Sequence, residues 1–284
     1  MTGTESGTGK DKTGDSADSV LVGRRDAEAG PGCVITLTLN RPDSLNAIDW
    51  DMVRALDSII DEIEADPEVR VLLITGAGRA FSAGGDLKKY MDLQGDPVGF
   101  PRFVADLHRV FGRLRELPVP VIALVNGVAV AGGLELVLNC DFALAADSAR
   151  IGDGHLNYGQ MGGGGALTLL PRMVGINRAL ELIFTGRLLS AQEAVEWCLV
   201  NRSVPDAELL EAGFQIAEEI ATKSPLAVAN AKHVSNAIWT AGLDVASGLR
   251  FEAERNSFYC LTSEDASEGL RAFDEKRAPR FKGR

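Results

Sequence analysis

One stretch that contains glycines at two turns, residues 119–141, constrains the fold of this chain more than any other. It opens with an apolar run at 119–125 that predicts a buried strand, breaks at the turn signal Asn126-Gly127, and then reaches Gly132-Gly133. The following residues, 134–139, predict the first turns of a helix. We therefore expect a strand, a glycine turn and a helix N-terminus in succession, with glycines that let the backbone come close to a ligand.

Glu135 lies in the first turn of that predicted helix. Free N–H groups and the positive end of the helix dipole favour an oxyanion at such a place. A carboxylate here can be a partner of the dipole and nothing more. Because Leu134 and Leu136 flank it, however, it can also be partly desolvated, which would raise its pKa toward a catalytic range.

Composition excludes several classes of protein. The net charge of -11 argues against a nucleic-acid surface, although a local anion site stays possible. No apolar run approaches the roughly 20 residues of a membrane span, and the N-terminus lacks the pattern of a signal peptide. The four cysteines show no CxxC spacing and the three histidines no metal-ligand spacing. We expect a cytoplasmic protein with reduced cysteines, no metal and no membrane contact.

The order of predicted elements suggests three regions. Residues 1–18 are almost free of apolar side chains and should form a disordered tail. Predicted strands (34–39, 69–75, 142–146) alternate with predicted helices (49–65, 100–117, 167–174) through a core at 19–215. Residues 216–284 read as helices alone, and their apolar stripes are longer than one core needs, which predicts packing on a neighbouring subunit.

Two further loops are rich in glycine. Residues 76–86 match neither a phosphate-binding Walker motif nor a dinucleotide fingerprint, so this loop is either an ordinary connection or the source of a second N–H donor at Gly85. The four glycines 162–165 suit only a tight turn or a close backbone contact. Between them lies a polar cluster at 148–159 that contains Asp153 and His155.

Four spaced motifs together resemble the crotonase (enoyl-CoA hydratase/isomerase) superfamily, over roughly residues 34–281. They are Asn40-Arg41-Pro42 with Leu45-Asn46-Ala47, the loop 81–87, the segment 126–136, and Glu268-Gly269 with 272–277. The resemblance implies an α/β fold, a spiral of ββα units with C-terminal helices that form trimers, often paired as hexamers. It also implies an acyl-CoA thioester as ligand, so that coenzyme A is part of the substrate and no separate cofactor is needed.

In that family two backbone N–H groups bind the thioester oxygen, and the matching residues are Gly85 and Gly132. Enolate formation beside a thioester places negative charge on this oxygen. Two fixed donors would stabilise it by roughly 3 kcal/mol each if they act like other oxyanion holes.

Hydratases of the family use two glutamates, and here the second one is missing. The first matches Glu135, whereas the second matches His155, with Gly154 in place of the usual proline. Family isomerases usually keep the second carboxylate and lack the first, so simple isomerisation is disfavoured. His155 can share proton transfer with Glu135, or be a loop histidine bonded to backbone. Asp153 can orient the imidazole or act as the base itself, and Tyr158 is a further candidate acid.

For coenzyme A, the resemblance implies contacts at the loop around Ser44 and Leu45, at Ala83 and at Asp86. Lys88 and Lys276 are candidates for the nucleotide phosphates, the latter sometimes from a neighbouring subunit in the family.

The leading hypothesis is an enoyl-CoA hydratase-type lyase. The alternative is another reaction on the same scaffold: thioester hydrolysis, hydrolytic carbon–carbon cleavage or decarboxylation of an acyl-CoA. A third possibility, a non-catalytic acyl-CoA-binding subunit, is opposed by the presence of Glu135 and both glycines.

Overall fold

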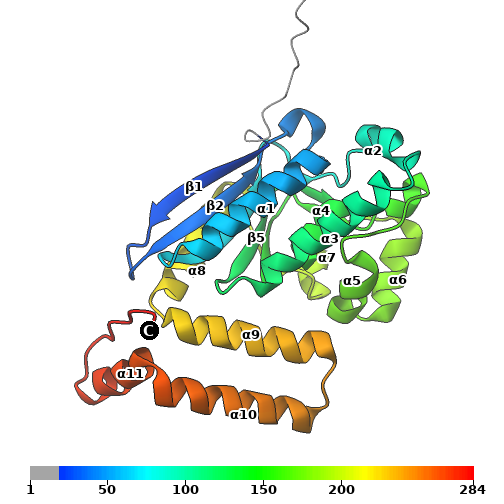
Figure 1. Cartoon of the computed structure of the whole chain (residues 1–284). Helices are drawn as coiled ribbons and strands as arrows, with labels where there is room; N and C mark the ends of the chain where they lie inside the picture. Colours follow the sequence, from blue (N-terminus) through cyan, green and yellow to red (C-terminus); the bar gives the residue numbers. More distant parts are fainter. Residues whose placement is uncertain (1–18) are drawn as a thin grey trace, which may run out of the picture.

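The computed structural model describes residues 19–284, and two β-sheets with the helices between their strands occupy the first two-thirds of the chain (Figure 1). The disordered tail expected at 1–18 lies outside the described residues. The larger sheet has the order β1-β2-β3-β5-β7-β10, and only β1 and β2 pair antiparallel in it. Its strands are Val20–Asp26, Cys33–Leu39, Val69–Gly76, Val121–Val125, Phe142–Ala146 and Arg202–Val204. The smaller sheet, β4-β6-β8-β9, comprises Ala80–Ser82, Val128–Val130, Arg150–Gly152 and Leu189–Ser190.

Successive units add one strand to each sheet and then a helix. β3 and β4 lead to α2 (Leu87–Gln94) and α3 (Gly99–Glu116), β5 and β6 lead to α4 (Gly132–Leu138), and β7 and β8 lead to α5 (Ala166–Val174). Parallel pairs join β3 to β5 to β7 and β4 to β6 to β8. This arrangement confirms the predicted spiral of ββα units.

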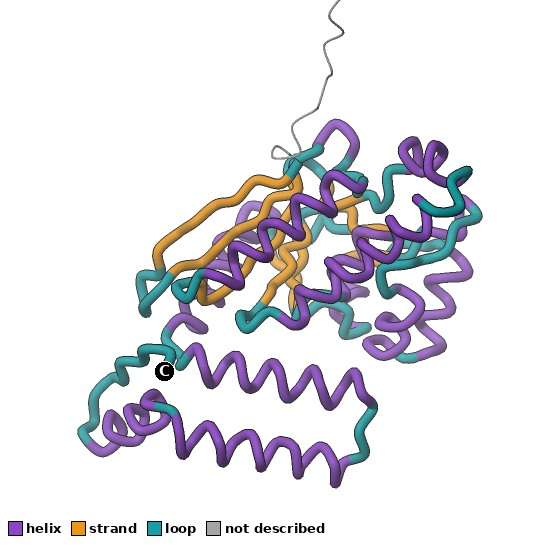
Figure 2. Tube along the Cα trace, in the orientation of Figure 1, coloured by secondary structure: helices purple, strands orange, loops and turns teal. Residues whose placement is uncertain are grey.

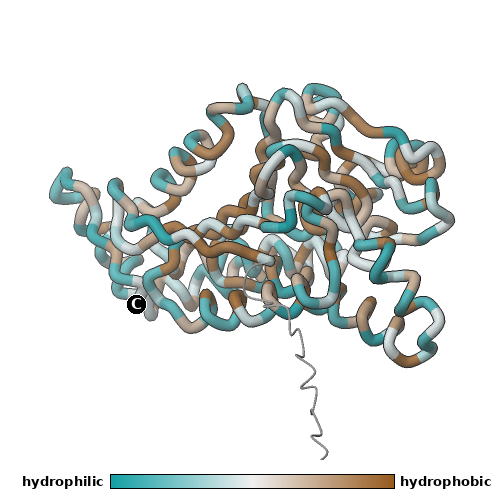
Figure 3. The backbone as a smooth tube through the Cα atoms, turned by 90° about the horizontal axis from the view of Figure 1, so that it is seen from above, coloured by the Kyte–Doolittle hydropathy of each residue, from teal (hydrophilic) through white to brown (hydrophobic). Residues whose placement is uncertain are grey.

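Helices cover both faces of the larger sheet, which explains its continuous apolar strands. Along β3, Leu72 and Ile74 pack toward α1 (Trp50–Ala65) and α3, whereas Val71 and Leu73 pack toward α8 (Leu209–Ala221). Figure 3 shows hydrophobic stretches along these strands in the middle of the molecule. Helix α8 crosses the expected boundary at 215/216, so the helices that leave the core begin only at Pro225.

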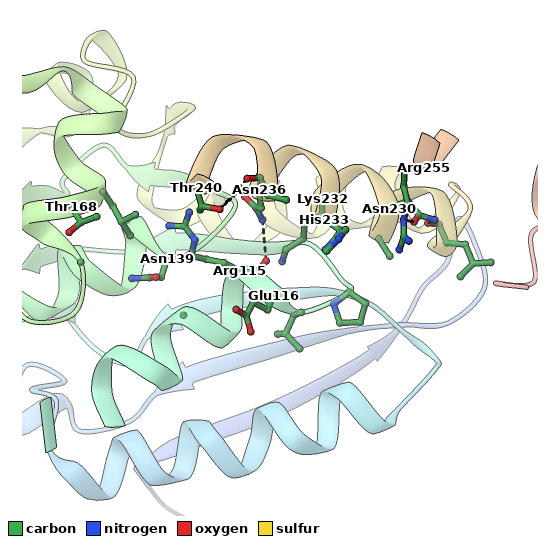
Figure 4. A pocket seen from close by; sticks show the side chains of 18 of the residues that line it. Arg115, Glu116, Asn139, Thr168, Asn230, Lys232, His233, Asn236, Thr240 and Arg255 are labelled. Atoms are coloured by element: carbon green, nitrogen blue, oxygen red, sulfur yellow. Dashed lines mark hydrogen bonds between the residues drawn. The ribbon is translucent and has the colours of Figure 1, made fainter. Parts of the chain in front are cut away.

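Three helices stand apart from the sheets: α9 (Pro225–Ala241), α10 (Val245–Thr262) and α11 (Glu264–Asp274), with α9 and α10 as a hairpin (Figures 1 and 2). Lys232 of α9 ties the hairpin to the core, because its Nζ lies 2.7 Å from Asp141 Oδ2 and donates to the carbonyls of Leu114 and Val119. Asn236, one turn further on, donates to the Arg115 carbonyl, as the dashed line in Figure 4 marks.

Most predicted helix starts are confirmed, and the exceptions have local causes. Asp49 accepts the Met52 N–H, and Ser190 forms a capping box with Glu193 before α7 (Ala191–Glu196). Helix α8 begins only at Leu209, because Asp206–Glu208 forms a 3-10 turn. The short strands β4, β6 and β8 have three residues each, too few to show a period in the sequence. The remaining helix, α6, spans Ile176–Thr185.

Candidate active site

Two glycine amides from separate turns open onto one pocket of about 400 Å³. Gly85 follows β4 and Gly132 begins α4, and a Cβ built on Gly132 would lie 3.4 Å from the Gly85 nitrogen. Within residues 19–284 no protein group accepts a hydrogen bond from either N–H. Paired unbound donors at one spot are what a carbonyl oxygen with developing negative charge requires.

The turn from β6 into α4 places the Gly132 amide. Ala131 has φ +52°, a left-handed value that is uncommon for a residue with a side chain. Its N–H donates to the Gly152 carbonyl, and its own carbonyl accepts the Glu135 N–H. Gly133 then passes so close to β4 that a Cβ would lie 2.3 Å from the Ser82 carbonyl oxygen. Close packing of α4 on β4 therefore brings Gly132 beside Gly85.

An arginine that sequence reasoning left without a role stabilises the other turn. Ile48 donates its N–H to the Gly84 carbonyl and accepts the Asp86 N–H, so backbone bonds flank Gly85 on both sides. Arg41 lies 3.1 Å from Asp49 Oδ2 and 2.8 Å from Asp86 Oδ2, joining the caps of α1 and α2. The motif Asn40-Arg41-Pro42 was the only sequence signal for this contact.

The Glu135 side chain is 1% exposed and is held by the glycine loop. Its Oε1 accepts N–H groups of Gly164 at 2.8 Å and Ala166 at 3.1 Å. A Cβ on Gly164 would lie 2.8 Å from the other carboxylate oxygen, so the four glycines serve close backbone contact. The charge of His155 and the two backbone hydrogen bonds lower the pKa of Glu135. Burial has the larger effect, so the pKa of Glu135 is raised.

His155 lies directly opposite Glu135, at the start of the 3-10 turn His155–Tyr158. Its Nε2 is 3.8 Å from Glu135 Oε2, and its Nδ1 bonds to Asp153 Oδ1, a carboxylate that is 1% exposed. Burial opposes protonation of the imidazole, but the Asp153 hydrogen bond and the Glu135 charge outweigh it, so the pKa of His155 is raised. The structure thus brings the three predicted catalytic side chains into one row.

The rest of the pocket is largely apolar. Its polar side chains include Asn157, Gln160 and Tyr90, and the Tyr90 hydroxyl faces the Gly85 turn. Tyr158 lines it too, but is 70% exposed. The apolar wall comes mainly from α2, α3 and the loop before the glycines: Leu87, Phe100, Val104, Leu107, Met161 and Leu188. Such a wall fits the hydrocarbon part of an acyl group.

The residues predicted to bind coenzyme A are spread more widely. Ala83 lines the pocket, and its N–H donates to the Leu45 carbonyl. Burial favours the neutral form of Asp86, but the Arg41 hydrogen bond and backbone N–H donors at the start of α2 lower its pKa, so its carboxylate is already engaged within the protein.

Apart from Ala83, the predicted ligands of coenzyme A lie outside the pocket lining. Ser44 Oγ bonds to the Arg41 carbonyl, and Lys88 is exposed on α2. Lys276 follows α11, at the opposite end of the molecule from α2 (Figure 1). Among residues 19–284 no group of three His, Cys, Asp or Glu side chains could hold a metal ion.

The chain is similar to enoyl-CoA hydratases over nearly its whole length. A family model described as enoyl-CoA hydratase/isomerase matches residues 29–284. The short-chain-enoyl-CoA hydratase of Clostridium acetobutylicum is 37% identical over 247 residues, 87% of this chain and 93% of that protein. The carnitinyl-CoA dehydratase of Salmonella typhi is 38% identical over 258 residues, 89% and 96% of the two chains. The crystal structure of an enoyl-CoA hydratase from Bacillus anthracis superposes with a TM-score of 0.85 at 38% identity, covering 94% of this chain and 100% of that one.

The fold, the paired amides and these similarities define an enzyme of the crotonase superfamily. The chain belongs to the enoyl-CoA hydratase/isomerase family, and it is an enoyl-CoA hydratase-like enzyme.

Proposed function

We propose that the enzyme adds water across the 2,3-double bond of a 2-enoyl-CoA, with Gly85 and Gly132 binding the thioester oxygen. The observation that carries this proposal is the placement of Glu135 and His155 in the pocket that the two unbound amides share. Their facing atoms are 3.8 Å apart, too far for a direct hydrogen bond and suitable for bridging by one water molecule.

In the proposed reaction, Glu135 takes a proton from the water while the water oxygen bonds to the β-carbon. The π electrons move to the thioester oxygen, where the two amides stabilise the enolate. His155 in its protonated form then donates to the α-carbon as the carbon–oxygen double bond returns. The proton on Glu135 passes to His155, which restores both groups, and one water has been added.

Asp153 is proposed to hold the imidazole with Nε2 directed at Glu135. The hydrogen bond from Nδ1 to the Asp153 carboxylate orients the ring. The negative charge of Asp153 also favours the protonated form of the imidazole. It is a positioning residue in this proposal, since its carboxylate is 1% exposed behind the ring.

The test is hydration of crotonyl-CoA by Glu135→Gln, followed as loss of the enoyl-thioester absorbance. Because the amide cannot accept the proton, we expect kcat to fall by about 10³-fold, with the exposed Glu196→Gln as a control of unchanged rate. Release of free coenzyme A without hydration would instead support a hydrolase. Binding of thioesters without turnover of any would support the non-catalytic alternative.

The proposal extends to assembly and location. Homotrimers or hexamers would place Lys276 of one copy near the nucleotide phosphates of another, since it lies far from α2 of its own chain. The arm formed by α9–α11 supports this, because it exposes large apolar side chains: Leu249, Phe258, Leu261, Leu270 and Phe273. We place the enzyme in the cytoplasm, in keeping with four free cysteines. None of the described helices is long and apolar enough to cross a bilayer.

A further inference from the structure

One polar side chain in the apolar wall of the pocket has no role in the proposed reaction. Tyr90, on α2, lines the pocket opposite α4, and a Cβ built on Gly85 would lie 2.6 Å from its hydroxyl oxygen. The hydroxyl therefore sits directly against the turn that carries one of the two amides.

The Tyr90 ring is fixed by aromatic neighbours. It packs edge-on against Phe103 at 5.2 Å and Phe100 at 6.0 Å between ring centroids. Within the part of the chain that the structure describes, its hydroxyl makes no hydrogen bond to protein. Burial and the nearby charge of Glu135 raise the pKa of this phenol, so it is a hydrogen-bond donor at neutral pH. A largely buried hydroxyl without a protein partner costs free energy unless a bound molecule supplies one.

The thioester oxygen is not the partner that this hydroxyl needs. A carbonyl oxygen has two lone pairs, and in the proposed site Gly85 and Gly132 take both. The neighbouring wall at Phe100 and Val104 is apolar, and within residues 19–284 none of the polar side chains that line the pocket accepts a hydrogen bond from the phenol. An acceptor on the acyl chain beyond its thioester group would pair this hydroxyl.

We propose that Tyr90 is a specificity-determining residue that donates a hydrogen bond to an oxygen substituent on the acyl chain, so that the substrate class is oxygenated 2-enoyl-CoAs. This inference rests on the proposed acyl-CoA site. A rigid phenol on one side of an apolar pocket selects a mostly hydrocarbon chain with one oxygen at a fixed place, and it discriminates against plain chains that leave the hydroxyl unpaired.

The test compares 2-hexenoyl-CoA with its 4-, 5- and 6-hydroxy derivatives on the wild-type enzyme and on Tyr90→Phe. The substitution keeps the ring and its packing and removes only the hydroxyl. We expect one hydroxy position to raise wild-type kcat/KM about tenfold or more over the plain chain, and Tyr90→Phe to abolish that preference. Tyr90→Phe should hydrate plain 2-hexenoyl-CoA at least as fast as wild type, because it removes the hydroxyl that a plain chain leaves unpaired. The control is Tyr259→Phe, which should keep the preference. The Tyr259 hydroxyl donates to Ser224 and lies away from this pocket.

Two outcomes would overturn the inference. In the first, wild type shows no preference for any hydroxy position. In the second, Tyr90→Phe slows every substrate by the same factor, which would place its hydroxyl on the thioester oxygen. Calorimetric binding of hexanoyl-CoA and its hydroxy derivatives separates this inference from the hydratase proposal. A preference in affinity that is lost in Tyr90→Phe would support the role of Tyr90 even in an enzyme that hydrates no enoyl-CoA.

Discussion

At the scale of single residues, the site depends on how burial and charge set the pKa values of two facing groups. Burial raises the pKa of Glu135, and the Asp153 bond together with the Glu135 charge raises that of His155. The two groups are close enough to titrate as a pair rather than independently. The raised pKa makes Glu135 a stronger base, and the raised pKa of His155 keeps more of its imidazole protonated, which suits proton transfer in both directions.

The pH dependence of kcat/KM tests this arrangement. We expect a bell-shaped profile whose acid limb lies above the ordinary carboxyl value of about 4.3 and whose alkaline limb lies above the ordinary imidazole value of about 6.5. His155→Gln should remove the alkaline limb and lower the rate by about 10²-fold or more. Asp153→Asn should shift that limb to lower pH, because it removes the bond and charge that raise the imidazole pKa. An alkaline limb that survives in His155→Gln would contradict the role of His155.

The same groups affect folding stability with one sign. Since both pKa values are raised in the folded state, the folded protein binds these protons more tightly than the unfolded chain does. Their contribution to the free energy of unfolding is fully present below the pKa values of the unfolded chain. It is lost as the pH rises through the pKa values of the folded protein. Melting temperatures of wild type should therefore fall more steeply above about pH 6.5 than those of His155→Gln.

At the scale of elements, the oxyanion site is a junction between helix starts. Arg41 joins the capping residues of α1 and α2, Asp49 and Asp86, and these caps enclose the turn that carries Gly85. On the other side, α4 lies directly on β4 at Gly133. The two amides are therefore positioned by contacts that involve no catalytic side chain.

Arg41→Lys tests this junction. A lysine keeps the charge, but its single ammonium group cannot bridge two carboxylates as the planar guanidinium does. We expect kcat to fall about tenfold with KM nearly unchanged, because a loosened Gly85 amide weakens binding of the enolate more than binding of the substrate. Arg54→Lys is the matched control, since Arg54 pairs with Asp51 on the exposed face of α1. A KM change with kcat intact would show that Arg41 acts on substrate binding instead.

At the scale of the whole molecule, the arm of α9–α11 leaves large apolar side chains exposed. Leu261 and Phe273 are each 86% exposed, and a groove of about 1130 Å³ separates the arm from the core. Figure 4 shows Arg115, Lys232 and Asn236 among the residues that line this groove. Its far wall includes Gly164 and Gly165, the back of the loop that holds Glu135. A neighbouring copy on this arm would therefore lie close to the catalytic loop.

Light scattering after size-exclusion chromatography tests the assembly. We expect wild type at three or six times the mass of one chain, and Phe258→Asp with Leu261→Asp as monomers, because two charges at an apolar interface oppose association. Leu210→Asp, at an exposed apolar residue of α8, should leave the mass unchanged. A monomeric wild type would contradict the proposed assembly.

The sequence by itself determined the order of most elements, because strand and helix periods, helix caps and glycine turns are local features. Its four motifs implied the class of fold through their resemblance to a known family. Asp49, Ser190 and the stretch 119–141 could be interpreted without any distant contact. The motifs also indicated Gly85, Gly132 and Glu135 as candidate site residues, and their roles stay predictions.

Only the tertiary structure decided which distant residues meet. The Gly164 amide reaches Glu135 across 29 residues, and Arg41 reaches Asp86 across 45. Asp86, expected to contact coenzyme A, caps α2 and pairs with Arg41. The contact of the Tyr90 hydroxyl with the Gly85 turn likewise appears only when α2 is folded against that turn. Such contacts depend on how the two sheets and their helices pack, and no short-range pattern in the chain encodes that packing.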